Sequence, residues 1–203
     1  MKSEKIPMKA ELFTANDVFF TEEVLTGEQV LRVTKNPEIL ADDEATFAQF
    51  ATDFKDGTIE VDVLSRLLPD APEHARGFIG LALRIDDQKN FEGIYVRPTN
   101  GRAKNQLRRN RAVQYFSYPE YKFDRFRAEN PGEYETYADI DIDQWIHLKI
   151  VVKGTTAELF INNAQQPSFI VVDLKHGENQ HGAIGLWVDL GTEGFFKNLV
   201  VSN

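Results

Sequence analysis

The 203-residue sequence predicts an all-β protein, built as an antiparallel sandwich or barrel. Apolar and polar residues alternate with period two, as in residues 59–63, Ile-Glu-Val-Asp-Val. Turn signals such as Asp56-Gly57 and Lys153-Gly154 separate these short runs. Because no linker, low-complexity tract or internal repeat interrupts the pattern, we expect residues 1–203 to form a single domain.

The strand signals follow one another along the chain, each ended by a turn residue or a proline. Residues 91–97 are followed by Pro98, and residues 113–118 by Pro119, which has no N–H to continue a sheet. The expected strands are residues 30–34, 59–63, 78–85, 91–97, 113–118, 146–152, 157–161, 169–172, 184–188 and 195–201.

Two segments do not follow this alternation. Phe47, Phe50 and Phe54 have the spacing of a helix face, but the run is short and fits a strand with an irregular entry equally well. Residues 119–144 are dense in charge and aromatic side chains, and a loop of that length without structure is unusual unless it is functional. We expect its aromatics to hold it against the sheet.

Composition and missing motifs exclude several classes of protein. There are no cysteines, so disulfides, thiolate metal sites and cysteine nucleophiles are absent. A net charge of −9 disfavours binding of nucleic acid by the whole molecule. The serine-hydrolase, P-loop and dinucleotide-binding motifs are missing.

No stretch is apolar and long enough for a membrane helix, and Met1 to Asp17 has no signal-peptide core. We therefore expect a cytoplasmic protein without nucleic-acid or membrane partners, although a trimmed secreted chain would look the same. The oligomeric state is open.

A basic, tyrosine-rich stretch stands out in this acidic chain. All six tyrosines lie between Tyr95 and Tyr137. Residues 97–127 contain nine basic and two acidic residues, a net charge of +7 where the whole chain carries −9. A packed core gains nothing from such a cluster, whereas arginine and tyrosine together suit recognition of polar, flat or anionic ligands.

The C-terminal half resembles a known superfamily. The Trp145 strand, Gln-Trp-Ile-His-Leu-Lys-Ile-Val-Val-Lys-Gly, is followed by Ala-Glu-Leu-Phe-Ile-Asn-Asn and then by Gly-Ala-Ile-Gly-Leu-Trp-Val ending at Val188. With Gly-Phe-Phe-Lys-Asn-Leu-Val-Val at residues 194–201, this resembles the concanavalin A-like lectin/glucanase superfamily, and within it bacterial LamG-like and 3-keto-disaccharide-hydrolase-like domains. The resemblance covers residues 55–201. It implies a jelly-roll sandwich of two antiparallel sheets, with sugars as the default ligands of a concave face.

The candidate ligand site combines the basic stretch with that face. Alternation places Tyr95 and Arg97 on one face of their strand, and Gln114 and Tyr118 on one face of the next. Sugar hydroxyls need donors and acceptors, sugar rings stack on aromatics, and an excess of arginine indicates an acidic sugar. A solvated edge strand with arginines that prevent aggregation is the alternative. The expected ligand-binding residues are Glu92, Tyr95, Arg97, Asn105, Gln106, Arg108, Arg109, Gln114, Tyr115 and Tyr118. Glu92 would serve as a base, a ligand for a hydroxyl or, more simply, a salt-bridge partner.

Catalytic and metal motifs are weaker. Glu60-Val-Asp62-Val-Leu-Ser65 approaches the Glu-x-Asp-x-x-Glu signature of laminarinase-type glucanases, but Ser65 replaces the second glutamate, so the carboxylate pair of a retaining glycosidase is incomplete. We interpret Glu60 and Asp62 as residues of an outer strand face. The acidic run 139–143 and the turn 189–193 are weak calcium candidates. The four histidines have no ligand spacing. We expect no metal and no cofactor, with calcium as the alternative.

These observations favour a carbohydrate-binding, lectin-like domain. One alternative is a glycoside hydrolase or a polysaccharide lyase on the same face, in which Tyr115 or Tyr118 would act as base beside Arg108, Arg109 and Gln114. Another is a protein-interaction module that uses residues 119–144. Whether the protein is an enzyme stays open. A cytoplasmic location favours a small saccharide or sugar acid over a polymer.

Overall fold

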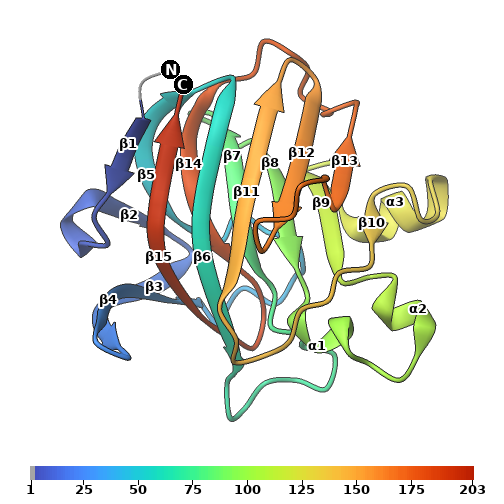
Figure 1. Cartoon of the computed structure of the whole chain (residues 1–203), viewed down its shortest axis with the longest axis horizontal. Helices are drawn as coiled ribbons and strands as arrows, with labels where there is room; N and C mark the ends of the chain where they lie inside the picture. Colours follow the sequence, from blue (N-terminus) through green and yellow to red (C-terminus); the bar gives the residue numbers. More distant parts are fainter. Residues whose placement is uncertain (1–2) are drawn as a thin grey trace.

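The computed structural model describes residues 3–203; Met1 and Lys2 lie outside the described residues. Two antiparallel sheets stack face to face as a jelly-roll sandwich, which confirms the expected fold class (Figure 1). Helix is confined to short segments. No helix within residues 3–203 combines the length and hydropathy that a membrane crossing requires.

One sheet has eight strands. Its order is β13-β12-β11-β6-β15-β4-β3, and β1 pairs with the end of β15. The strands are β1 (Ser3–Ile6), β3 (Val18–Leu25), β4 (Glu28–Lys35), β6 (Gly57–Leu67), β11 (Ile146–Lys153), β12 (Thr156–Ile161), β13 (Phe169–Val171) and β15 (Thr192–Ser202).

The other sheet has seven strands in the order β10-β9-β8-β7-β14-β5-β2. They are β2 (Phe13–Asn16), β5 (Phe47–Phe54), β7 (Ile79–Ile85), β8 (Phe91–Val96), β9 (Val113–Tyr118), β10 (Glu135–Thr136) and β14 (Gly182–Val188). Its face turned away from the other sheet is called the concave face below, after the ligand face that the resemblance implies. The helices α1 (Pro98–Gly101), α2 (Gln106–Arg109) and α3 (Phe123–Glu129) gather beside β9 and β10, while the 3-10 helix η1 (Ala10–Leu12) precedes β2 (Figure 1).

The main core lies between the sheets and is made by the inward half of each alternation. Ile59, Val61 and Val63 of β6 are fully buried there, together with Leu81 of β7 and Ile94 of β8. Each such side chain contributes roughly 1.5–3 kcal/mol by leaving water. The period-two pattern read from the sequence is therefore the pattern of this core.

All ten expected strands are present. The segment with Phe47, Phe50 and Phe54, for which the sequence allowed a helix or a strand, is strand β5. Phe47 belongs to the aromatic cluster on the concave face, whereas Phe54 lies in the core and Phe50 packs against that core. The helix-like spacing arises because both faces of this strand carry phenylalanine. The sequence did not predict β1, β2, β3 or β10, or the three helices.

Residues 119–144 are held against the sheet as expected. Phe126 of α3 and Tyr134 are buried in the main core, with ring centroids 4.0 Å apart. The ring of Tyr115 lies 5.5 Å from each of them. This segment is therefore a fixed part of the fold and not a free loop.

A fully buried arginine closes one end of the sandwich. Arg84 sits at the irregular pairing of β7 with β14 and has a φ of 55°. Its guanidinium donates to the carbonyl oxygens of Lys55 at 2.6 Å, Gly154 at 2.9 Å and Gly177 at 3.3 Å, and to Asp56 at 3.0 Å. One side chain thus joins three turns that are distant in sequence.

We expect Arg84→Met to lower the free energy of unfolding by about 2–4 kcal/mol, because three carbonyl oxygens would lose a buried donor. Urea denaturation measures this. The matched control is Arg66→Met, since Arg66 pairs with Asp143 where both side chains are exposed, and its loss should stay within about 1 kcal/mol. Equal losses in the two variants would contradict the assignment.

Candidate functional site

The concave face is largely covered by its own aromatic side chains. Phe47, Phe91, Tyr95, Phe116 and Trp187 form a buried cluster there, separate from the main core. Tyr95 and Trp187 have ring centroids 4.6 Å apart and lie on either side of Gly80, which pairs with both. A Cβ at Gly80 would collide with Tyr95, so glycine is required for this packing. Open space remains at one end of the face.

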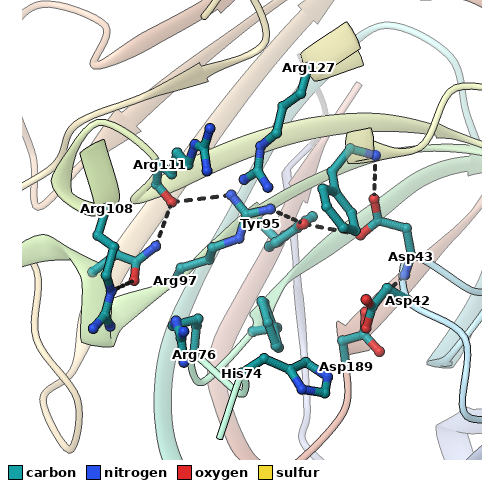
Figure 2. Close-up of a pocket in the computed structure, with 13 residues that line it drawn as sticks. Asp42, Asp43, His74, Arg76, Tyr95, Arg97, Arg108, Arg111, Arg127 and Asp189 are labelled. Atoms are coloured by element: carbon teal, nitrogen blue, oxygen red, sulfur yellow. Dashed lines mark hydrogen bonds between the residues drawn. The ribbon is translucent and has the colours of Figure 1, made fainter. Parts of the chain in front are cut away.

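A pocket of about 310 Å³ occupies that end (Figure 2). Its floor includes Tyr95 of β8 and Arg97, which directly follows that strand, and the segments after β4, β6, β8, β9 and β14 supply its walls. This volume lies near the small end of the usual ~300–1,000 Å³ range for ligand pockets. The full lining is Asp42, Asp43, His74, Arg76, Phe78, Tyr95, Arg97, Asn100, Arg108, Arg111, Phe123, Arg127 and Asp189.

Five arginines line the pocket, and Figure 2 shows them on the side away from the aspartates. Arg97, Arg111 and Arg127 share the carboxylate of Glu135, at 3.8, 3.3 and 3.0 Å. That carboxylate is only 9% exposed, so one buried negative charge faces three positive ones. The arginine side therefore carries excess positive charge.

Arg76 and Arg108 form no salt bridge within residues 3–203. Arg76 donates to the carbonyl oxygens of Glu73 and Ala75, both at 2.7 Å. Arg108 donates to Asn100 Oδ1 at 3.1 Å and reaches Thr99 at 3.4 Å. Burial lowers the pKa of Arg76, and the nearby charges of Arg108 and Arg97 lower it further. Guanidinium stays protonated in proteins, so these two side chains are positive charges without a salt-bridge partner among the described residues.

Arg97 anchors the arginine side and is 4% exposed. It donates to the hydroxyl of Tyr95 at 2.6 Å, to the carbonyl of Arg111 at 3.1 Å and to Gln114 Oε1 at 3.3 Å. The hydroxyl of Tyr95 donates in turn to Asp43 Oδ1 at 3.0 Å. Burial raises the pKa of Tyr95 well above its usual value. This chain of contacts joins the arginine side of the pocket to the opposite side.

Three aspartates line the opposite side (Figure 2). Asp189 accepts from the ammonium of Lys35 at 2.6 Å, in an ion pair whose side chains are 3% and 2% exposed. Its other oxygen accepts from the backbone N–H of Asp43 at 2.9 Å. The pair thereby fixes the loop between β4 and β5 over the concave face. Asp42 Oδ1 is buried without a hydrogen-bond partner among the described residues.

Burial and a neighbouring charge perturb these carboxyls. Burial and the charge of Asp189 together raise the pKa of Asp43 to about 7, against the opposing effects of Arg97, Phe123 N–H and Tyr95. Burial and Asp189 also raise the pKa of Asp42. The aspartate side can therefore hold a proton near neutral pH, which makes it able to donate as well as accept hydrogen bonds.

The structure separates the sequence-predicted residues into three groups. Tyr95, Arg97 and Arg108 line the pocket, and Gln114 lies buried beneath Arg97. Four others lie elsewhere on the surface: Asn105 caps α2, Gln106 bonds Asn110, Arg109 contacts Tyr137, and Tyr118 stacks on Phe91 at 5.3 Å.

Glu92 and Tyr115 point to the opposite face of the sheet. They meet each other at 2.7 Å in the interior, where Glu92 also accepts from the backbone N–H of His176. Alternation accounts for this, because residue 92 faces away from 95, and residue 115 away from 114. Neither side chain contacts the pocket, so Glu92 is a structural partner and Tyr115 has no access to a ligand there.

Sequence reasoning missed the aspartate side and part of the arginine side. Asp42, Asp43, His74, Arg76 and Phe78 lie outside the basic stretch and reach the pocket only through the fold. The signal available for Asp42 and Asp43 was the loop run Asp-Asp-Glu between two strands, since functional side chains concentrate on loops.

Of the other sequence candidates, only Asp189, from the calcium-candidate turn 189–193, lines this pocket. Glu60 and Asp62 are on the outer face of the eight-stranded sheet, as interpreted, where they flank the ring of His147 at 3.2 and 2.7 Å. Arg102 contacts Asp139 and Asp141 of the acidic run. Within the described residues, no group of three or more His, Asp or Glu side chains is arranged to hold a metal ion. The absence of a cofactor stays a prediction.

Neither a family model nor a curated protein matches this sequence. Solved structures do match its fold. The carbohydrate-binding module CBM66 from Bacillus subtilis is 17% identical, over 93% of this chain and 97% of that chain, with a TM-score of 0.55. A cellulose-induced protein, Cip1, is 12% identical over 96% and 93%, with a TM-score of 0.54. A putative glycosyl hydrolase from Parabacteroides distasonis is 12% identical over 100% of both chains, with a TM-score of 0.53. The chain therefore has the concanavalin A-like jelly-roll fold.

The raised pKa of Asp43 predicts a pH-dependent stability. A carboxyl with a higher pKa in the folded state than in the unfolded state stabilises the fold only while it is protonated. Its contribution is complete below pH ~4 and is lost as the pH rises toward 7. The Asp43→Asn variant lacks this titration. Its unfolding free energy relative to wild type should therefore rise by on the order of 2–4 kcal/mol between pH 4.5 and 7.5 in urea titrations. A difference that does not change with pH would contradict the prediction.

Proposed function

We propose that the pocket at the end of the concave face binds a saccharide that carries a negative charge, such as a sugar acid. The observation that carries this proposal is the pair Arg76 and Arg108, which line the pocket without a carboxylate partner among the described residues. A ligand carboxylate would supply the missing counterion. Guanidinium binds carboxylate through two parallel hydrogen bonds, which gives orientation as well as affinity.

The remaining lining suits the neutral part of a sugar. Asp42 Oδ1 is buried and has no hydrogen-bond partner within residues 3–203, so a sugar hydroxyl that donates to it would remove a desolvation cost of about 1–3 kcal/mol. Phe78 and Phe123 add aromatic surface to the lining. Aromatic rings pack against the apolar face of a pyranose, while carboxylates and amides bind its hydroxyls. Acidic and neutral parts of one ligand thus meet opposite sides of the pocket.

The comparisons support a saccharide ligand. One similar solved structure is named a carbohydrate-binding module and another a cellulose-induced protein, and both have the jelly-roll fold of this chain. Fold alone does not establish a ligand, so the proposal depends on the pocket's own charges and hydrogen-bonding groups.

The side chains of the pocket suit recognition of a ligand better than they suit catalysis by a lyase. Tyr115 lies in the interior, and Tyr118 stacks on Phe91 outside the pocket lining. Tyr95 reaches the pocket, but burial raises its pKa well above the usual value and its hydroxyl proton is donated to Asp43, so it stays protonated and is a poor base. Recognition by arginines, aspartates and aromatics needs no metal or cofactor. A small acidic saccharide matches both the size and the charge of the pocket.

The test is a thermal-shift and calorimetric titration of glucuronate, galacturonate and mannuronate against glucose, galactose and mannose. A ligand at a hundred times its Kd stabilises the fold by about 2.7 kcal/mol, which is readily detected. We expect binding of at least one uronate, and a loss of about tenfold or more in affinity in Arg108→Ala and Arg76→Ala. The matched control is Arg102→Ala, an exposed arginine of the same basic stretch outside the pocket.

Two results would overturn the proposal. One is the absence of any uronate binding to folded wild-type protein. The other is uronate binding that Arg76→Ala and Arg108→Ala leave unchanged. Analysis of the sugars after incubation reports on chemistry separately, because a new product would identify the pocket as an active site.

A further inference from the structure

A second cavity of about 380 Å³ adjoins the proposed sugar pocket. Arg111 and Arg127 line both cavities, so these two side chains form the partition between them. Figure 2 shows them together along one edge of the first pocket. The second cavity is lined by Leu107, Asn110, Arg111, Arg127, Pro131, Gly132, Glu135, Thr136 and Tyr137. The two cavities thus lie next to each other along the arginine side of the first pocket.

The partition is charged and accessible. Glu135 accepts hydrogen bonds from Arg127, the shortest at 3.0 Å, and lies 3.3 Å from Arg111 Nε in an ion pair without a hydrogen bond. The two arginine side chains are nevertheless 32% and 26% exposed. Each therefore keeps donors that a ligand spanning the partition can reach.

One wall of the second cavity is made of exposed apolar side chains that take no part in the core. Tyr137 is 39% exposed and Leu107 is 58% exposed, and neither belongs to a core cluster. Tyr137 is held in place by Arg109, whose guanidinium lies 4.9 Å from the ring centroid and donates to the hydroxyl at 3.0 Å. A fixed, solvent-facing tyrosine beside arginine donors has the components of a stacking platform for a sugar ring.

We infer that the second cavity is a second sugar subsite, and that the ligand is an acidic oligosaccharide of at least two units. This inference rests on the proposed function of the first pocket. One unit occupies the pocket between Arg108 and Asp42, and the linkage crosses the partition. The next unit lies against Tyr137, with its acidic group within reach of Arg111 and Arg127. The role of Arg109 is then to position Tyr137, and Arg109 itself contacts no ligand in the first pocket.

The test compares the uronate that binds best as a monosaccharide with its homo-disaccharide, by isothermal titration calorimetry. We expect the disaccharide to bind about tenfold more tightly or better, since a second stacked and charged unit adds contacts. Tyr137→Ala should abolish that gain and leave the monosaccharide affinity unchanged. Tyr137→Phe, which keeps the ring, should retain most of the gain. Phe19→Ala is the matched control, because Phe19 is also an exposed aromatic, at 62%, but lines neither cavity.

The outcomes separate the two proposals. Equal affinity of wild type for monosaccharide and disaccharide overturns the second subsite and leaves the first pocket standing. The same holds if Tyr137→Ala keeps the disaccharide gain. If Arg108→Ala leaves monosaccharide binding intact, the proposed function itself fails and the second subsite fails with it. Tyr137 is exposed, so its substitution should not unfold the protein; an unchanged melting temperature without ligand verifies this.

Discussion

The candidate site depends on one constraint, the need to compensate the buried guanidinium of Arg97. A charge that is 4% exposed must be hydrogen-bonded or it destabilises the fold. Its partners come from four places in the chain: Tyr95 on its own strand, the carbonyl of Arg111, Gln114 on β9 and Glu135 on β10. Satisfying this one group brings β10 and the segment before β9 to the edge of the concave face. The segment before β9 bears Arg108 and Arg111 of the arginine side, and Arg127 lies on α3, ahead of β10.

The aromatic cluster decides where the site can lie. Rings from β5, β8, β9 and β14 cover most of the concave face, and close packing is possible because glycines such as Gly80 leave room for them. The open end lies where the sheet meets the loops around Asp42 and Asp189. There the buried Lys35–Asp189 pair fixes one wall, and Arg97 fixes the other. The pocket is thus the polar end of a sheet face that is otherwise covered by apolar side chains.

Charge is separated across this pocket in a way that favours a particular ligand. Carboxyls with raised pKa values stand opposite Arg76 and Arg108, which form no salt bridge within residues 3–203. A neutral sugar would leave the arginine side uncompensated, and a simple anion would leave Asp42 without a donor. The sugar acid that we propose would meet both requirements, and the cavity behind Arg111 and Arg127 would hold the second unit that we infer.

The sequence alone determined the sandwich and the strand faces, since period-two alternation is set by burial along each strand. It thereby placed Tyr95, Arg97 and Gln114 on one face, and it marked the basic stretch that supplies most of the arginine wall. Glu92 and Tyr115 lie at the alternate positions of their strands and therefore point into the interior, although the sequence analysis had included them in the ligand site. Only the tertiary structure brought Asp42, Asp43, Arg76 and Asp189 to the pocket, because contacts between distant loops are fixed by buried hydrogen bonds and ion pairs that leave no local pattern.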